Sequence, residues 1–487
     1  MGLSIRTFDE TDLLLDIEAV EQLRDRIRGR VLTPTSRDYD EARTIWNAMI
    51  DRRPALVARC TNAEDVSRSV RFAREHRLKF SVRGGGHNIA GNAIADQGLL
   101  IDLSPMRSVG INPERRRAHV EPGATLGELD RAAQAFGLVT PLGINSTTGV
   151  AGLTLGGGFG WLSRRLGLTI DNLVGAEVVT ATGERVPVSQ RDEPDLFWAI
   201  RGGGGNFGVV TSFEFQLHDA GPQVLAGLVV HPLEGAREVL RFYREFIMDA
   251  PDELACWFVL RKAPPLPFLA PEWHGREILA LAICYLGDLD DGERATRPLR
   301  DVGHPIADVV SPHEYTAWQT VLDPLLAPGM RNYWKSHDFH ELSDGLIDVL
   351  LAHAQQLPDP QTEIAVAQLG GIIGRVPNDT TAYTHRDAQL LMNVHGRWAD
   401  PAKDELCIAW ARALFQAAAP YATGGVYVNF LTQEEEARVR AAYGTNYDRL
   451  VALKNRYDPA NLFRMNQNIR PTAFAIPGAE RERELRL

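Results

Sequence analysis

The chain has 487 residues, is 44% hydrophobic and carries a formal net charge of −11, which together are typical of a globular protein with a large buried core. The acidic charge argues against nucleic-acid binding, which requires a basic face, and no run of 18 apolar residues predicts a transmembrane helix. The N-terminus has no apolar signal segment, and the four scattered cysteines form no C-x-x-C motif. These features predict reduced thiols in the cytoplasm and no zinc site.

The first half of the chain alternates short strands with helices. We expect residues 1–35 to form a charged lead-in and residues 36–219 to form one domain. Helices are predicted over Asn62–His76, which opens with an N-cap-like Thr-Asn-Ala-Glu sequence, and over Leu126–Phe136.

Three consecutive glycines interrupt this pattern at residues 84–86. Without Cβ atoms, the backbone can adopt positive φ and approach a flat or anionic ligand closely. Arg83 precedes the glycines and could meet negative charge, while His87 follows them and supplies an imidazole. Taken alone, the segment is also compatible with an exposed glycine-rich turn.

A second glycine-rich segment covers Thr140–Trp161, where glycine recurs at short intervals among small and apolar residues. We expect neither a regular helix nor a linker here, because a linker would be polar. The composition indicates a backbone wrapped around a ligand, with apolar side chains covering the rings of that ligand.

A third glycine cluster contains Gly203, Gly205 and Gly208, which match the dinucleotide fingerprint G-x-G-x-x-G. That fingerprint requires a following helix whose N-terminus meets the pyrophosphate. Here Val209–Leu217 alternates with period two and is β-branched or aromatic, which predicts a strand. The context therefore argues against a Rossmann domain.

Residues 220–420 lose the glycine clusters and are expected to form a second domain that shapes a substrate pocket. An antiparallel sheet covered by helices is predicted. The expected strands cover Leu225–His231, Ile278–Leu286 and Ile364–Gly370, and the expected helices cover Gly235–Asp249, Asp344–Gln356 and Asp404–Ala418.

Residues 421–487 are expected to return to the first domain and to end in a charged helix over Glu480–Leu487. Within this segment, alternation over Gly424–Phe430 predicts a strand. Tyr427 and Asn429 would then lie on the same face of that strand.

In their order along the chain, these segments resemble the vanillyl-alcohol oxidase (PCMH-type) superfamily, in its berberine-bridge-enzyme-like and 6-hydroxynicotine-oxidase-like branch. Tyr457–Ile469 resembles the element that closes this fold over the flavin, and the likeness runs from about residue 36 to residue 472. It implies an α+β fold with a PCMH-type FAD-binding domain of two α/β subdomains. A substrate domain of antiparallel sheet and helices follows, and the C-terminal segment returns to the flavin domain.

The resemblance implies FAD as cofactor, bound covalently through His87 and the 8α-methyl carbon of the flavin. The residues that it places around the FAD are Arg83, Gly84, Gly85, Gly86, His87, Asn88, Gly91, Pro141, Gly143, Thr148, Gly149, Gly152, Leu153, Gly156, Gly157, Gly158, Gly160, Trp161, Asn172, Val178, Gly208, Val210, Asn466 and Asn468.

Many berberine-bridge-like oxidases form a second bond to the flavin, from a cysteine two residues after the glycine equivalent to Gly143. In this chain that position is Asn145, and no cysteine lies between Gly143 and Trp161. The resemblance therefore implies a single link, as in the 6-hydroxynicotine-oxidase-like members. Polyol or oligosaccharide substrates, which are typical of doubly linked members, are less expected.

The catalytic candidates are Tyr427 and Asn429, which resemble the Tyr-x-Asn-aromatic strand that passes under the substrate in the family. A phenolate could serve as base if a cation or hydrogen bonds lowered its pKa. The alternative is a sheet tyrosine with a satisfied hydroxyl. Because Asn429 replaces a glutamate of berberine-bridge enzymes, the identity of the base stays open. Pocket residues of the family are expected at Gln368, Tyr333 and His385.

Two further groups are open to interpretation. One is an aromatic set that either lines the pocket or packs the second domain, namely His313, Tyr315, Trp318, Tyr333 and Trp334. The other is His337 and His340, whose spacing on a helix would suit a metal, but no third ligand is in view. We therefore predict no metal site.

The sequence thus predicts an FAD-linked oxidase that acts on a C–N or C–OH bond of a small, fairly apolar molecule, with molecular oxygen as acceptor. One alternative is a flavin-dependent dehydrogenase or a tailoring enzyme of secondary metabolism that uses another acceptor. A second is a flavin carrier without turnover. No nucleic-acid or membrane partner is expected, and the oligomeric state stays open.

Overall fold

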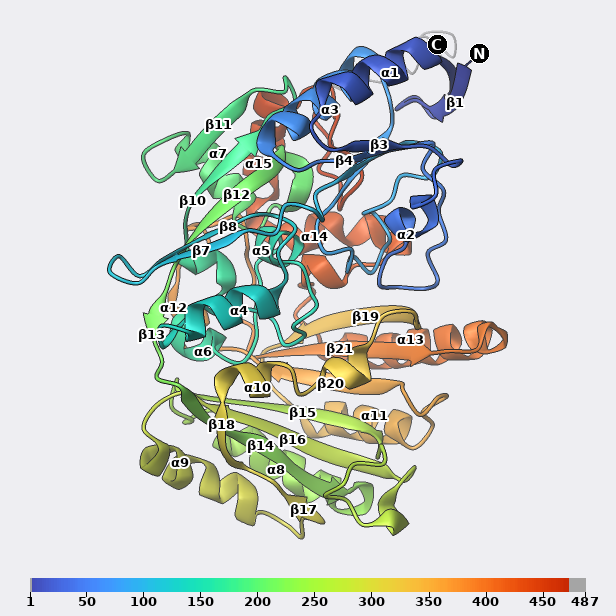
Figure 1. The fold of residues 1–487 in the computed structure, drawn as a ribbon. Helices are drawn as coiled ribbons and strands as arrows, with labels where there is room; N and C mark the ends of the chain where they lie inside the picture. Colours follow the sequence, from blue (N-terminus) through green and yellow to red (C-terminus); the bar gives the residue numbers. More distant parts are fainter. Residues whose placement is uncertain (1, 473–487) are drawn as a thin grey trace, which may run out of the picture.

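The structure is a computed structural model that describes residues 2–472, with two smaller sheets above one large sheet (Figure 1). The four-stranded sheet follows the order β3-β4-β6-β5, with β4 and β5 parallel to β6. Its strands are β3 (Arg30–Leu32), β4 (Leu56–Arg59), β6 (Leu99–Asp102) and β5 (Phe80–Arg83). The helices α1 (Ile17–Arg26) and α3 (Ala63–Glu75) share its hydrophobic core.

Helix α3 confirms the predicted start, because the side chain of Asn62 accepts a hydrogen bond from the backbone N–H of Asp65. A hairpin of β1 (Gly2–Arg6) and β2 (Asp12–Asp16) precedes α1. Strand β3 pairs with β4, so the first 35 residues contribute a strand to this sheet.

The five-stranded sheet is antiparallel and follows the order β11-β10-β12-β8-β7. Its strands are β11 (Arg185–Ser189), β10 (Leu173–Val179), β12 (Val209–Gln216), β8 (Arg117–Val120) and β7 (Val109–Asn112). The helices that share its core are α4 (Leu126–Gln134), α7 (Pro194–Ile200) and α15 (Tyr447–Tyr457).

Strand β12 confirms that the third glycine cluster runs into a strand and not into a helix. Gly208 has φ +154°, and a Cβ there would overlap Val178 and the carbonyl of Val179 on β10. This glycine therefore allows two strands to approach closely, which is a different role from that of the last glycine in a Rossmann fingerprint.

The C-terminal segment packs against this glycine cluster. Lys454 of α15 donates hydrogen bonds to the carbonyls of Asn206 (2.7 Å) and Phe463 (2.9 Å), and it pairs with Asp458 at 2.7 Å. Both side chains of the pair are fully buried. The charged helix predicted over Glu480–Leu487 lies outside the described residues.

The large sheet has eight strands in the order β17-β14-β16-β15-β20-β21-β19, with β18 also paired to β14. Each of these strand pairs is antiparallel, as predicted. The strands are β14 (Gln223–Pro232), β15 (Leu254–Lys262), β16 (Glu277–Tyr285), β17 (Ala307–Asp308), β18 (Ser311–Glu314), β19 (Arg331–Phe339), β20 (Glu363–Gln368) and β21 (Leu390–Trp398).

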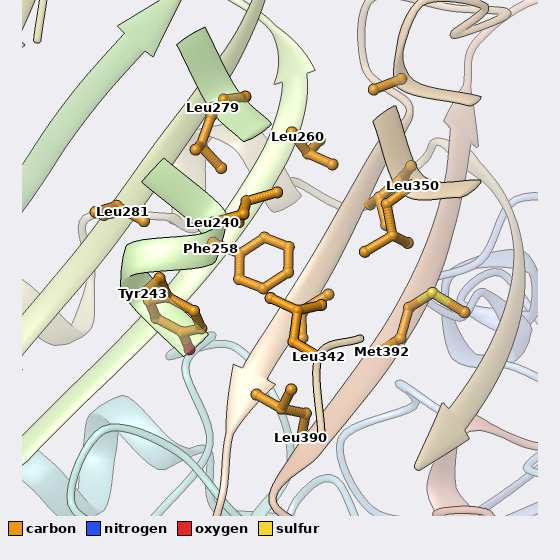
Figure 2. Packing of buried hydrophobic residues seen from close by; sticks show 14 of the residues in the cluster. Leu240, Tyr243, Phe258, Leu260, Leu279, Leu281, Leu342, Leu350, Leu390 and Met392 are labelled. Carbon is orange, nitrogen blue, oxygen red and sulfur yellow. The ribbon is translucent and has the colours of Figure 1, made fainter. Parts of the chain in front are cut away.

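Helices cover one face of this sheet and share a hydrophobic core with it (Figure 1). They are α8 (Ala236–Phe246), α9 (Leu289–Asp301), α11 (Asp344–Ala354) and α13 (Asp404–Ala418). Figure 2 shows Phe258 of β15 among Leu240 and Tyr243 of α8 and Leu342. The predicted sheet covered by helices is confirmed.

Side-chain alternation gives the large sheet two different faces. Cys256, Phe258 and Leu260 of β15 belong to the core under the helices, whereas Trp257 and Val259 line a cavity on the opposite face. The same alternation holds along β16, β20 and β21, so residue parity decides which side chains reach the cavity.

Two local predictions are wrong, and one helical spacing that the sequence left open is not observed. Gly424–Phe430 pairs with no strand in the described chain and ends in a single 3₁₀ turn over Val428–Phe430, which the N–H of Phe430 closes on the carbonyl of Tyr427 (3.0 Å). The segment Thr140–Trp161 contains a short helix, α5 (Val150–Leu155). His337 lies on strand β19, so the helical spacing to His340 does not apply.

Within residues 2–472, no helix combines the length and the apolar character needed to span a bilayer.

Candidate active site

Two adjoining cavities are found, the first among segments of the smaller sheets and the C-terminal segment, and the second between residues 84–153 and the uncovered face of the large sheet. The first, about 980 Å³, is bordered by β5, β12, the third glycine cluster and the C-terminal segment. The second, about 1960 Å³, is bordered by residues 84–88, residues 143–153 and the large sheet. Five residues line both cavities, namely Gly84, Asn88, Ala93, Gly152 and Asn429. An elongated ligand could therefore extend from one cavity into the other.

The first glycine segment, residues 84–86, lies where the two cavities adjoin, and its backbone packs closely against neighbouring segments. A Cβ on Gly85 would lie 2.5 Å from the Cα of Gly149, and a Cβ on Gly84 would lie 2.7 Å from the carbonyl oxygen of Pro122. No side chain fits at either position. Because Gly85 is nevertheless exposed, its main chain is open to a ligand in the second cavity.

His87 lines the second cavity immediately after these glycines. Its ring stacks on Trp46, with centroids 5.1 Å apart, and its Nε2 lies 3.1 Å from the hydroxyl of Thr147. Burial lowers the pKa of His87 to about 4, which outweighs the opposite effect of a hydrogen bond from the ring to the backbone of Thr147. The imidazole is therefore neutral at pH 7 and keeps a lone pair on one ring nitrogen.

Asn145 is buried next to this imidazole. Its side-chain oxygen accepts hydrogen bonds from the backbone N–H (3.0 Å) and the hydroxyl (2.8 Å) of Thr147. The four cysteines of the chain, Cys60, Cys256, Cys284 and Cys407, are all buried and unpaired, and none of them lines either cavity.

The first cavity has the free space and the unpaired polar groups expected of a cofactor-binding site. A Cβ on Gly152 would meet nothing within 4 Å, and one on Gly205 would only just reach Asn466, so both glycines leave free space in the cavity. The side-chain oxygen of Asn466 is buried without a partner. No charged side chain lines this cavity, so backbone N–H groups and asparagines would have to receive a phosphate.

Arg83 does not take the predicted role. It is buried, and its guanidinium forms an ion pair with Asp102 at 2.8 Å and donates to the carbonyl of Thr44. The side chain is directed by the carboxylate at the end of the neighbouring strand β6, and it lines neither cavity.

The other predicted FAD residues divide into two groups. Lining one or both cavities are Gly84, Gly85, Gly86, His87, Asn88, Gly143, Thr148, Gly149, Gly152, Leu153, Trp161, Gly208, Val210 and Asn466. Outside the linings, with Arg83, are Gly91, Pro141, Gly156, Gly157, Gly158, Gly160, Asn172, Val178 and Asn468.

Part of the second group positions the catalytic candidates. A Cβ on Gly156 would overlap the amide of Asn429, and the N–H of Gly158 donates to the hydroxyl oxygen of Tyr427 at 3.1 Å. These glycines therefore leave the space that Asn429 occupies and hold Tyr427 in place, although they do not border the cavities themselves.

Tyr427 and Asn429 both line the second cavity, and their side chains touch in spite of the missing strand. The amide of Asn429 donates to the hydroxyl oxygen of Tyr427 at 2.9 Å. Burial raises the pKa of Tyr427 to about 12, and the hydrogen bonds from Asn429 and Gly158 only partly offset it. The lowered pKa required for a phenolate base is therefore absent, and Tyr427 keeps its proton at pH 7.

The three residues expected in the substrate pocket lie elsewhere. Gln368 has the parity of the helix-covered face and accepts from the N–H of Cys256 (3.0 Å). Tyr333 also lies on that face, where Arg412 of α13 donates to its hydroxyl (3.0 Å). The ring of His385 contacts the carbonyl of Ala441 (2.7 Å). None of them borders the second cavity.

The members of the aromatic set lie in different parts of the structure, and so do the surroundings of the two histidines. Trp334 lines the cavity, whereas Tyr315 and Trp318 pack in a hydrophobic core. His337 stacks on Phe415 and contacts its carbonyl (3.0 Å), and His340 is exposed. Among residues 2–472, no group of three potential metal ligands is found.

Several cavity residues were not predicted from the sequence. They are Trp46, before the first glycine segment, and Trp257, Arg261, Glu363, Asn393 and His395 on the large sheet. For the sheet residues the available signal was strand parity. Glu363 and the alternate positions of β21 are polar in otherwise apolar strands, and a polar residue on a buried strand indicates a site.

Comparisons with known proteins agree with this geometry. A family profile described as "FAD binding domain" matches residues 54–189, and one described as "Berberine and berberine like" matches residues 426–470. The FAD-linked oxidoreductase YgaK of Bacillus subtilis is 32% identical over 453 residues, covering 92% of this chain and 98% of that protein. The chain belongs to the berberine-bridge-like family of FAD-linked oxidoreductases.

Other proteins to which the chain is similar carry a substrate in their names. (R)-6-hydroxynicotine oxidase of Paenarthrobacter nicotinovorans is 32% identical, covering 91% of this chain and 97% of that protein. The crystal structure of 6-hydroxy-D-nicotine oxidase from Arthrobacter nicotinovorans superposes with a TM-score of 0.82 at 30% identity, covering 91% and 98% of the two chains. Xylooligosaccharide oxidase of Myceliophthora thermophila, at 24% identity and a TM-score of 0.81 over 93% and 99%, shares the fold.

The cavities fit the FAD that this family binds. The glycine-walled first cavity could hold the adenosine and pyrophosphate parts against main-chain N–H groups, with Asn466 as a further polar partner. The wider second cavity, between His87 and the large sheet, has room for the flavin ring together with a substrate.

Proposed function

We propose that the protein is an oxidase that holds FAD by one covalent link through His87. It would oxidise a C–N or C–OH bond of a small, fairly apolar molecule, and molecular oxygen would take up the electrons. When bound, FAD supplies the hydride acceptor.

The observation that carries this proposal is the position and state of His87. Its imidazole borders the second cavity, between the exposed main chain of Gly85 and the ring of Trp46. It is neutral at pH 7. A ring nitrogen with a lone pair beside a flat, glycine-walled site is what a bond to the edge of a flavin requires.

A single link is supported by the surroundings of Asn145. The position at which other family members carry a cysteine is here an amide that is hydrogen-bonded to Thr147. The buried, unpaired state of all four cysteines also supports the cytoplasmic location that the sequence predicts.

The wall of the second cavity supports an apolar substrate. Its large-sheet side carries Leu228, Val230, Val259, Ala280 and Leu391. An oligosaccharide would leave many hydroxyl groups unpaired against such a wall. The named substrate of the 6-hydroxynicotine oxidase relative is a small heteroaromatic molecule, which agrees with this lining.

The role of Tyr427 follows from its hydrogen bonds. Its oxygen already accepts two N–H groups, from Gly158 and Asn429, so its own proton is available to a group in the cavity. We therefore infer that Tyr427 acts as a hydrogen-bond donor near the reacting atoms and not as a phenolate base.

Replacing Asn429 with alanine is expected to raise the KM for the substrate about five- to tenfold, as loss of one hydrogen-bonding group in the cavity should do. If the amide contacts the flavin, the variant is expected to shift the flavin absorption spectrum instead. Steady-state kinetics and a spectrum of the purified variant measure both. Unchanged KM and unchanged spectrum would contradict a role for Asn429 in the cavity.

Acid precipitation of the purified protein tests the covalent link. The pellet is expected to stay yellow, and its band on a denaturing gel is expected to fluoresce as flavin. Complete release of FAD into the supernatant would refute the covalent link, while leaving the family assignment intact.

A further inference from the structure

The uncovered face of the large sheet carries one charged row at the edge of the second cavity. Arg261 of β15 lies directly opposite Glu363 of β20, which in turn lies directly opposite His395 of β21. All three line the cavity, as does Asn393, two residues before His395 on the same face. Along the same strand faces the neighbouring cavity-lining positions are apolar, at Val259, Ala365 and Leu391, so the four residues form a compact polar subsite.

The row is tied together by short contacts. The guanidinium of Arg261 meets one carboxylate oxygen of Glu363 at 2.6 Å, and Nδ1 of His395 lies 3.0 Å from the other. Burial raises the pKa of Glu363, but the charge of Arg261 and the contact with His395 outweigh it and bring the pKa to about 2. Glu363 is therefore ionised and must accept the proton on Nδ1.

This contact fixes the state of the opposite ring nitrogen. Burial lowers the pKa of His395 more than Glu363 raises it, so the ring is neutral and Nδ1 carries its only N–H. Nε2 is then a bare acceptor. Within residues 2–472 it is buried without a hydrogen-bond partner, and the same is true of the side-chain oxygen of Asn393.

The two unpaired acceptors lie on one strand face of the cavity. They determine which kind of ligand group could pair with them. Buried polar groups in proteins are almost always paired, and unpaired ones at a site indicate a ligand. The missing partner must donate, because an acceptor such as an ether or a carboxylate would be repelled by both atoms. The indole of Trp334 also lines the cavity and lies edge-to-face with the imidazole of His395, with ring centroids 4.7 Å apart, so a donor group here would lie beside aromatic surfaces that suit a planar ligand.

We propose that His395 and Asn393 form a substrate subsite that accepts a hydrogen bond from an O–H or N–H group of an aromatic or heteroaromatic substrate. Glu363 is a positioning residue that keeps Nε2 free of a proton, and Arg261 holds Glu363. This inference deepens the proposed function, on which it rests, by naming the substrate class.

The subsite and the reactive end of the cavity are separate. Ring contacts lead from His395 to Trp334, from Trp334 to Phe430 (5.3 Å) and from Phe430 to Tyr427 (5.0 Å). The donor group would therefore anchor one end of the substrate, while the bond to be oxidised lies nearer Tyr427.

Binding of two matched probes to the flavin-loaded protein tests the subsite without turnover. 2-Naphthol carries a donor, whereas 2-fluoronaphthalene has a similar shape and no donor. By titration calorimetry at pH 7, wild type is expected to bind 2-naphthol at least about tenfold more tightly, the effect of one good hydrogen bond. His395→Leu and Asn393→Leu should each reduce this preference and leave the affinity for 2-fluoronaphthalene within about twofold.

His340→Leu is the matched control, because His340 is exposed and lies outside the cavity. It should keep the wild-type preference. Equal affinity of wild type for both probes would overturn the proposal, as would a preference that survives in both His395→Leu and Asn393→Leu. Protein that carries no covalent flavin would refute the proposed function instead, so the two failures are distinguishable.

The positioning role of Glu363 has its own readout. In protein labelled with ¹⁵N-histidine, His395 is expected to show a protonated Nδ1 and a bare Nε2. The double variant Glu363→Leu/Arg261→Leu removes both charges together and should allow a proton on Nε2, with loss of the 2-naphthol preference. An unchanged tautomer in the double variant would contradict this role.

Discussion

Replacement of Tyr427 with phenylalanine is expected to slow reduction of the flavin by substrate by about 10²–10⁴, the usual contribution of a positioned acid–base group. Covalent FAD and its spectrum should stay intact. Tyr427 lines the cavity, and its oxygen is held by Gly158 and Asn429, so only the donated proton is lost. Anaerobic stopped-flow measurement of flavin reduction gives the rate directly.

Tyr383→Phe is the control for this variant. The ring of Tyr383 packs against Tyr427, with centroids 6.4 Å apart, but it does not line the cavity. Its loss of a hydroxyl should leave flavin reduction within about threefold of wild type. Equal rates in wild type and Tyr427→Phe would remove Tyr427 from the mechanism.

The pH profile separates the two possible roles of Tyr427. Its pKa is raised to about 12, so the protonated form persists throughout the neutral range and is lost only as the pH approaches that value. A hydroxyl donor therefore predicts no contribution from Tyr427 to the pH dependence of reduction between about pH 6 and pH 9. A phenolate base predicts a tenfold rise per pH unit in wild type that disappears in Tyr427→Phe.

Replacement of His87 with alanine is expected to abolish covalent flavin completely. The protein should still fold and bind FAD reversibly, because the glycine walls of the first cavity and Asn466 are unchanged. Acid precipitation, followed by absorbance measurements on the pellet and the supernatant, shows how much flavin stays with the protein and how much is released. Flavin that stays on the denatured variant would show that another residue is attached.

Thr147→Val is the matched control, because it removes the hydroxyl next to Nε2 of His87 but keeps the imidazole. Covalent flavin should still form in it. The low pKa of His87, about 4, further predicts that attachment of FAD to unloaded protein does not change between about pH 5 and pH 8. Attachment should fail only as the pH approaches 4, where the ring gains a proton.

Local sequence patterns predicted the fold well wherever the pattern depends on one strand or one helix alone. The strand after Gly208 and three strands of the large sheet were predictable, because short runs of apolar and β-branched residues favour a strand. The Gly424–Phe430 segment shows the limit of such patterns. Alternation suits a strand, but a strand also needs a neighbour, and this segment has none in the described chain.

The site was predictable in part. His87, Tyr427 and Asn429 reach the cavity as expected. Arg83 does not, because its partner Asp102 lies on a strand that only the tertiary fold places beside it. Polar residues on apolar strands marked single positions such as Glu363 and His395, but their meeting with Arg261 in one row could not be predicted, for the same reason as for Arg83. The members of this row come from three strands far apart in the sequence and meet through the sheet register.

The central claim is that this chain carries a covalent flavin that, once reduced, delivers electrons to oxygen. Photochemical reduction of the loaded protein without air, followed by rapid mixing with aerated buffer, tests it without knowledge of the substrate. We predict that the yellow absorbance returns within seconds, that one hydrogen peroxide forms per flavin, and that the flavin afterwards stays with the denatured chain. Reduced flavin that persists for many minutes in air would contradict an oxidase and favour a dehydrogenase that uses another acceptor.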